Sequence, residues 1–179
     1  MAAHGFILWF TGMPGAGKST LARAMRDRLV SRACRVEILD GDEVRESLSK
    51  DLGFSKGDRD TNIRRIGYVA RLLSRNGIVA IVAAVSPYRA VREEVRRAQE
   101  APFVEVYLEC PLEELMRRDP KGLYQRAIKG ELTGLTGLSD PYEPPLRPDI
   151  LIRTDLKSVE ESCVQIVEWL EVRAFIVGH

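Results

Sequence analysis

One short motif near the start of the chain restricts its fold more than any other feature. Residues 12–19 read Gly-Met-Pro-Gly-Ala-Gly-Lys-Ser, which matches G-x-x-x-x-G-K-[ST] and follows the apolar run 6–10 after one residue, Thr11. Glycines allow the tight bend that turns several backbone N–H groups toward one anion, and the lysine adds a point charge for the β- and γ-phosphates. A chance match is the alternative, but a strand-like run before the motif and a helix-like run after it are the context of a true site. The motif predicts that ATP is held by Gly12, Met13, Pro14, Gly15, Ala16, Gly17, Lys18, Ser19 and Thr20, with the Ser19 hydroxyl as a ligand of Mg²⁺.

The bulk composition is that of an ordinary globular protein. The chain has 179 residues, 45% hydrophobic and 30% charged, so we expect a single domain over residues 1–179. A net charge of +1 gives no overall electrostatic field that would attract nucleic acid or a membrane surface. The sequence shows neither a stretch long enough to span a bilayer nor a signal peptide, so we expect a cytoplasmic protein. The chain has an odd number of cysteines, Cys34, Cys110 and Cys163, and no C-x-x-C pair. We therefore expect buried free thiols rather than disulfides or a zinc site.

Apolar runs and helical periodicities alternate along the chain. Strands are predicted at 5–10, 35–39, 78–83, 103–108 and 150–152, and helices at 19–31, 43–48, 60–75, 88–99, 112–118 and 158–171. This order predicts an α/β protein with a five-stranded parallel sheet and helices on both faces, and together with the glycine-rich motif it predicts the three-layer P-loop NTPase fold. Residues 119–149 break the pattern with three glycines and four prolines after residue 129, and we interpret them as a lid with one helix at 123–129. A surface insertion without function is the alternative.

Three chain segments are expected to meet in one crevice. The glycine-rich loop, Asp40-Gly41-Asp42 and Ser86-Pro87 each follow a predicted strand, and ligands of such folds lie beyond the carboxyl ends of the strands. Of Asp40 and Asp42, one is expected to accept the proton of an acceptor hydroxyl while the other holds Mg²⁺ through water. The alternative for Asp42 is a cap on the helix that follows.

Basic and aromatic side chains suggest how anions and a base are held. Arg117 and Arg118 stand at the entrance of the lid, where they would face the transferred phosphoryl group or, alternatively, only solvent. A second group, Arg45, Arg59, Arg64 and Arg65 with Asn62 nearby, suits phosphate or sulfate. Phe54 lies in a predicted loop, where it would stack on a base or belong to a satellite core.

Several blocks in fixed order make the chain resemble the adenylylsulfate kinase (APS kinase) family. The blocks lie at residues 11–20, 39–45, 51–55, 59–66, 85–89, 118–124, 134–137 and 140–143, and they span nearly the whole sequence. The first block is shared by many kinases, whereas the later ones are close to diagnostic of this family. The resemblance implies transfer of the ATP γ-phosphate to the 3′-hydroxyl of adenosine 5′-phosphosulfate (APS). It also suggests a homodimer and a functional link to an ATP sulfurylase.

The resemblance also implies roles for individual residues. APS would be held by Asp40, Asp42, Arg45, Arg59, Asn62 and the lid residue Lys121, with Phe54 stacked on its adenine. Ser86 matches a position described in the family as a phosphoserine intermediate. Direct in-line transfer needs no phosphorylated enzyme intermediate, and no histidine that could activate the serine is near Ser86 in sequence. The alternative is therefore that Ser86 lines the substrate pocket.

The chain departs from the family pattern at Leu135, where a phenylalanine is usual. Leucine can pack on adenine but offers no π-face, which costs on the order of 1 kcal/mol of stacking. A different nucleotide-like acceptor or a small sugar acid therefore stays open as a second hypothesis. A GTP switch or motor ATPase is disfavoured because the chain lacks N-K-x-D and the apolar run 78–84 ends in Val85-Ser86 rather than an aspartate.

Overall fold

The computed structural model describes residues 5–177 and contains one parallel sheet of five strands. The strands are β1 (Ile7–Thr11), β2 (Val36–Asp40), β3 (Val79–Ala83), β4 (Phe103–Glu109) and β5 (Ile150–Arg153), in the spatial order β2-β3-β1-β4-β5. Every neighbouring pair is parallel; Leu8 of β1, for example, pairs with Ile81 and Val104. The predicted fold class is confirmed, and the strand bounds differ from prediction by at most two residues.

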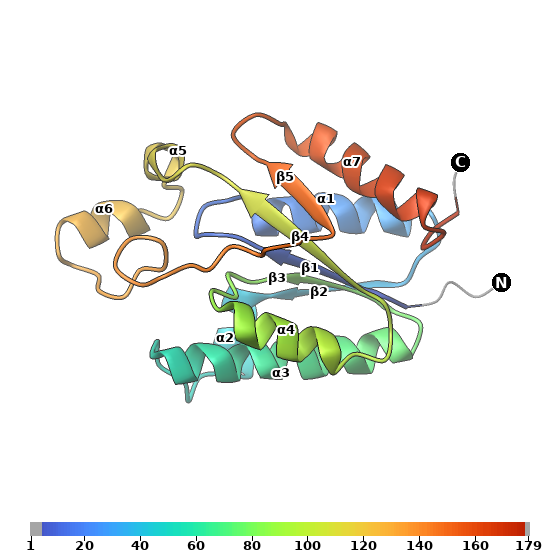
Figure 1. Ribbon diagram of the computed structural model, residues 1–179, viewed down its shortest axis with the longest axis horizontal. Helices are drawn as coiled ribbons and strands as arrows, with labels where there is room; N and C mark the ends of the chain where they lie inside the picture. The colour runs from blue at the N-terminus through green and yellow to red at the C-terminus, as the bar shows by residue number, and fades with distance from the viewer. Residues whose placement is uncertain (1–4, 178–179) are drawn as a thin grey trace.

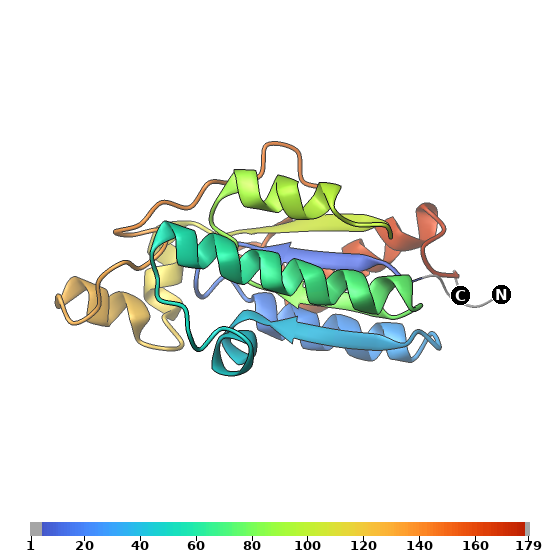
Figure 2. The same cartoon turned by 90° about the horizontal axis from the view of Figure 1, so that it is seen from below.

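Helices cover both faces of the sheet (Figures 1 and 2). α1 (Lys18–Val30) and α7 (Val159–Val172) lie together on one face, and α2 (Gly41–Ser47), α3 (Lys56–Arg75) and α4 (Arg89–Arg97) on the other. α5 (Leu112–Arg118) and α6 (Leu123–Ile128) project beyond the end of the sheet toward which the β4 arrowhead points. The predicted helix inside residues 119–149 is thus confirmed, whereas closure of this lid segment over a ligand stays a prediction.

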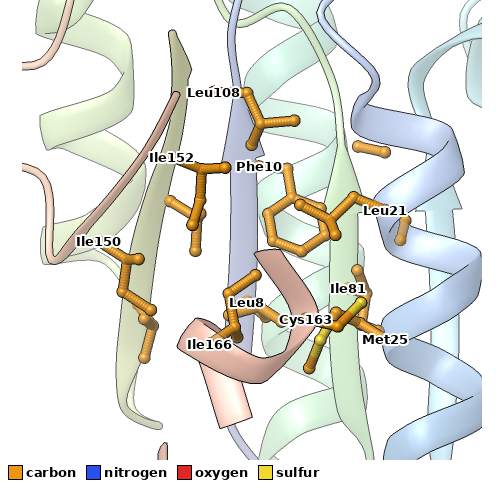
Figure 3. Packing of buried hydrophobic residues seen from close by; sticks show 14 of the residues in the cluster. Leu8, Phe10, Leu21, Met25, Ile81, Leu108, Ile150, Ile152, Cys163 and Ile166 are labelled. Atoms are coloured by element: carbon orange, nitrogen blue, oxygen red, sulfur yellow. The ribbon is translucent and has the colours of Figure 1, made fainter. Parts of the chain in front are cut away.

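Two hydrophobic cores lie on opposite sides of the sheet because successive strand residues point to opposite faces. Leu8 and Phe10 of β1 pack toward α1 and α7 (Figure 3), whereas Ile7 and Trp9 pack toward α3 and α4. β1 is buried along its whole length, which explains why its sequence is a continuous apolar run rather than an alternating one.

The three cysteines are free and buried, as the sequence predicts. Burial raises the pKa of each thiol, so these side chains behave as small apolar groups. No helix in the described part of the chain has the length and apolar character needed to cross a membrane.

Candidate active site

A cleft of about 980 Å³ opens at the carboxyl ends of the strands. Its lining includes the glycine-rich loop, the Asp40–Asp42 bend, the Ser86-Pro87 corner, Arg118 and the lid residues 119–121, 123–124 and 132–136. The three segments expected to meet in one crevice therefore do so.

The glycine-rich loop forms a cradle around the amino group of Lys18. Gly15 and Gly17 adopt φ values of 79° and 93°, which favour glycine, and Gly17 is the N-cap of α1. Lys18 Nζ donates to the carbonyl oxygens of Gly12 and Met13, both at 2.8 Å. Burial lowers the pKa of Lys18 to about 8, with Asp42 opposing this effect. The lysine is thus a buried donor at the bottom of an anion-binding turn.

Asp40 and Asp42 lie in the same cleft but make different contacts. Asp40 Oδ2 accepts from Ser19 Oγ at 2.5 Å, and Asp40 Oδ1 accepts from the Asp42 backbone N–H at 3.0 Å. Asp40 is therefore the N-cap of α2, and the alternative that Asp42 caps this helix is wrong. The Asp42 side chain is exposed and forms an ion pair with Lys121 of the lid segment.

The predicted acceptor-side residues cluster around Phe54. This ring is 66% exposed, and the Arg45 guanidinium lies 4.5 Å from its centroid. Asn62 is buried beside the cleft, and its Oδ1 has no hydrogen-bond partner within residues 5–177, so one acceptor is free for a ligand. Burial and the charge of Arg59 lower the pKa of Arg45.

Arg59 is largely occupied by the protein itself. It donates to the carbonyl oxygens of Phe54 (2.8 Å) and Gly134 (2.6 Å), and also to Thr136 Oγ1 and Asp140 Oδ2. These bonds hold the Phe54 loop against the lid segment, so the structure gives Arg59 a tethering role that its sequence motif does not reveal. Arg64 and Arg65, also in the predicted basic group, pair with Glu94 and Asp51 and do not line the cleft.

Lid residues contact both sides of the cleft. Tyr124 of α6 donates from its hydroxyl to the Pro14 carbonyl at 2.8 Å, and burial raises the pKa of Tyr124 to about 12. Leu135 lines the cleft, but its side chain is 7% exposed and belongs to the core on the α1 side. Phe54 is thus an exposed aromatic ring at the cleft, whereas Leu135, at the position where the family usually has phenylalanine, is mostly buried.

The Ser86 hydroxyl is enclosed by protein atoms. Ser86 is fully buried, its Oγ donates to the Ala84 carbonyl at 3.1 Å, and it accepts from Trp9 Nε1 at 3.0 Å. Neither partner is a base that would activate the hydroxyl as a nucleophile. This geometry favours the alternative in which Ser86 shapes the floor of the cleft.

On the donor side, the structure differs from the sequence-based prediction at Arg117 and adds lining residues that the prediction missed. Arg117 is 73% exposed, pairs with Glu114 and does not line the cleft, whereas Arg118 does and donates to the Thr154 carbonyl. The missed lining residues lie on α1 (Arg23), in the loop after β5 (Thr154 and Lys157) and on the first turn of α7 (Val159 and Ser162). The loop after β5 follows the carboxyl end of a strand, so the rule that located the other segments also applies to it.

Comparisons with known proteins agree with this geometry. The family model for adenylylsulphate kinase matches residues 4–153. An adenylyl-sulfate kinase of Picosynechococcus sp. is 53% identical over 176 residues, which cover 98% of this chain and 99% of the relative. A probable bifunctional SAT/APS kinase of Sorangium cellulosum is also 53% identical, but the matched region is 29% of its length. The Mycobacterium tuberculosis APS kinase CysC, solved in complex with AMPPNP and APS, superposes with a TM-score of 0.89 at 40% identity, covering 94% of this chain and 98% of that chain. The chain belongs to the adenylylsulphate kinase family.

Proposed function

We propose that the protein is an adenylyl-sulfate kinase, which transfers the γ-phosphate of ATP to the 3′-hydroxyl of APS. The observation that carries this proposal is a single cleft with a phosphate-binding lysine, two carboxylates and an exposed aromatic ring flanked by arginines. Phosphoryl transfer depends mainly on in-line positioning and on positive charge around the moving group. Lys18 and Arg118 supply charge on the donor side, while Arg45, Asn62 and Lys121 meet the phosphosulfate substrate.

The contacts of the two carboxylates support a division of labour. Both oxygens of Asp40 are engaged, one by Ser19 and one by the α2 N-terminus. The Asp42 carboxylate is exposed and its ion pair with Lys121 also lies on the surface, so an incoming hydroxyl can replace that partner. Asp42 is therefore the group that orients the 3′-hydroxyl and accepts its proton, and Asp40 is a positioning residue for Ser19.

The residues present fit a magnesium ion held together with substrate phosphates. Ser19 Oγ and the Asp40 carboxylate are adjacent hard oxygen donors at the mouth of the loop. Within residues 5–177 no group of three or more His, Cys, Asp or Glu side chains forms a complete cage, which suits Mg²⁺ because this ion keeps waters and binds phosphate oxygens. When bound, Mg²⁺ supplies charge that offsets the β- and γ-phosphates.

The direct test is a comparison of acceptors with identification of the product. Purified protein is assayed by coupled ADP release with APS, AMP, adenosine and gluconate, and the APS product is analysed by ³¹P NMR. We expect turnover with APS, a new 3′-phosphomonoester resonance and, in Lys18→Ala, a loss of about 10²–10³-fold in kcat. No turnover of APS with good turnover of another acceptor would overturn the substrate assignment and favour the second hypothesis, which Leu135 keeps open.

The cellular setting is proposed on the same basis. A cytoplasmic enzyme that works beside an ATP sulfurylase suits a kinase whose acceptor is APS, and the bifunctional relative supports this link. A homodimer is the assembly suggested by the family resemblance. Neither nucleic acid nor a membrane is a proposed partner, since the net charge is +1.

A further inference from the structure

A fully buried arginine lies behind the cleft and takes no part in the transfer described above. Arg92 of α4 is 2% exposed, although its guanidinium carries a full charge. A buried charge is costly unless it is paired and its hydrogen-bond donors are satisfied. The partners of Arg92 therefore indicate what this side chain does in the fold.

Three segments that are distant in sequence converge on this guanidinium. Arg92 Nε donates to Glu105 Oε1 of β4 at 3.0 Å. Arg92 Nη1 donates to the Ser86 carbonyl at 2.6 Å, and Nη2 donates to the Glu143 carbonyl at 2.6 Å. The planar fork of arginine can reach all three partners at once, whereas a lysine ammonium of the same length cannot reproduce this geometry.

The Ser86 partner is a strained corner on the floor of the cleft. Ser86 has a φ of 47°, in the left-handed region that residues other than glycine rarely adopt. Such a conformation persists only where the surroundings fix it. Arg92 fixes the Ser86 carbonyl, while Trp9 Nε1 and the Ala84 carbonyl fix its hydroxyl.

The Glu143 partner is the point where the lid segment returns to the body of the protein. The Glu143 N–H donates to the Pro87 carbonyl at 2.8 Å, and its carboxylate accepts from the Arg89 N–H at 2.8 Å. The return arm of the lid, residues 134–146, is thus attached to the corner that contains Ser86. Arg92 lies beneath this attachment and bonds to both parts.

We propose that Arg92, with Glu105 as its counter-ion, is a positioning residue that fixes the strained Ser86 corner and the Glu143 end of the lid in the arrangement that binds the acceptor substrate. The competing explanation is an ion pair that only stabilises the fold. The substrate part of this inference rests on the proposed function, but the positioning itself can be measured without any substrate.

The chain offers a matched control on the same helix. Arg96 lies one turn after Arg92, pairs with Asp149 at 2.6 Å and approaches Glu105 at 3.8 Å. None of its hydrogen bonds within residues 5–177 reaches Ser86 or Glu143. Arg96→Gln therefore weakens the ion-pair network around Glu105 and leaves both tethers in place.

The test compares Arg96→Gln with Arg92→Lys and with the double variant Arg92→Met/Glu105→Leu. The double variant keeps the fold testable, because replacing a buried ion pair by apolar side chains of similar volume is often neutral or stabilising. The first readout is the indole ¹⁵N–¹H resonance of Trp9, assigned with Trp169→Phe, together with amide hydrogen exchange over residues 134–146. In both Arg92 variants we expect the Trp9 indole resonance to shift and the amide protons of the return arm to exchange at least about tenfold faster. Arg96→Gln should change neither the resonance nor the exchange rates.

The second readout is the Michaelis constant for each substrate. Both Arg92 variants are expected to raise KM for APS about tenfold or more and to change KM for ATP less than about twofold. The reason is that the Ser86 corner and the Glu143 end of the lid, which these variants would misplace, lie on the acceptor side of the cleft. The proposal would be overturned if the Arg92 variants left the Trp9 resonance and the exchange rates of residues 134–146 unchanged. It would also be overturned if their KM for APS changed only in proportion to the melting temperature and equalled that of Arg96→Gln. If the wild-type protein does not use APS, the proposed function fails, and the substrate-free readouts still decide whether Arg92 positions the corner and the lid.

Discussion

Two aspartates separated by one glycine have different surroundings because only one of them begins a helix. The predicted helix starts at residue 43, but α2 starts at Gly41, so the cap is Asp40. Glycine is a poor helix former, and its presence at the first position hides the start of this helix from propensity arguments. The sequence thus predicts that both carboxylates lie at the cleft, and it cannot predict which one is engaged by the helix N-terminus.

The exposed carboxylate of Asp42 is expected to matter for the rate, and the helix-capping carboxylate of Asp40 also for stability. Asp42→Asn should lower kcat by about 10²–10⁴-fold with an unchanged melting temperature, because Asp42 is exposed and accepts the proton of the acceptor hydroxyl. Asp40→Ala should in addition lower the free energy of unfolding by about 1 kcal/mol, because it removes the cap of α2. Single-turnover rates and thermal melts of both variants check this. Equal kcat in Asp42→Asn and wild type would rule out Asp42 as the base.

The buried lysine gives ATP binding a predictable pH dependence. Since burial lowers the pKa of Lys18 to about 8, most of the free protein holds a neutral Lys18 at pH 9. A bound triphosphate favours the charged amine, so binding of an ATP analogue should take up close to one proton at pH 9 and almost none at pH 6.5. Titration calorimetry in buffers of different ionisation enthalpy measures this uptake.

The matched control for this prediction is Lys18→Arg, whose side chain stays charged and should show no proton uptake.

The lowered pKa of Lys18 also determines how the free energy of unfolding changes with pH. The unfolded chain, with its ordinary lysine pKa of 10.5, binds more protons than the folded one above pH 8, so this group makes stability rise with pH between about 8 and 10.5. Zero uptake by the wild-type protein at pH 9 would mean that Lys18 is not the buried group described here.

At the scale of elements, the lid segment is fixed to the cleft at several separate points. Tyr124 is tied to the glycine-rich loop, Arg59 holds residues 134–140 against the Phe54 loop, and Lys121 pairs with Asp42. The sequence predicts the bounds of this segment and its helix, because glycine and proline mark where regular structure ends. It cannot predict these ties, because each joins residues more than 70 positions apart.

The Lys121–Asp42 pair is expected to serve substrate binding rather than stability. Both side chains are more than half exposed, and exposed pairs contribute roughly 0–1 kcal/mol. Lys121→Ala should therefore keep the melting temperature but raise KM for APS about tenfold, since one charge-assisted bond to an anionic substrate is lost. Lys129→Ala, at an exposed lid lysine outside the cleft lining, is the control and should keep both values. A similar KM change in both variants would assign the effect to net charge.

At the scale of the whole molecule, strand order determines which loops can meet. β1 lies in the centre of the sheet between β3 and β4, so the glycine-rich loop after β1 is flanked by the corner after β3, and the bend after β2 lies beyond it. A parallel sheet makes it predictable from alternating strands and helices that these segments share one edge, whereas the strand order itself comes from the structure. The hydrogen-bond partners inside the cleft, such as those of Ser86 and Arg59, depend on packing and emerge only from the structure.

The central claim is that one phosphoryl group passes directly from the donor side of this cleft to the acceptor side. The stereochemistry at phosphorus tests it most directly, with ATP made chiral at the γ-phosphorus by oxygen isotopes and with APS as acceptor. Each in-line displacement inverts the configuration, so direct transfer predicts inversion in the 3′-phosphate of the product. Net retention would contradict the account, because it requires two displacements and a phosphorylated residue such as Ser86 between them.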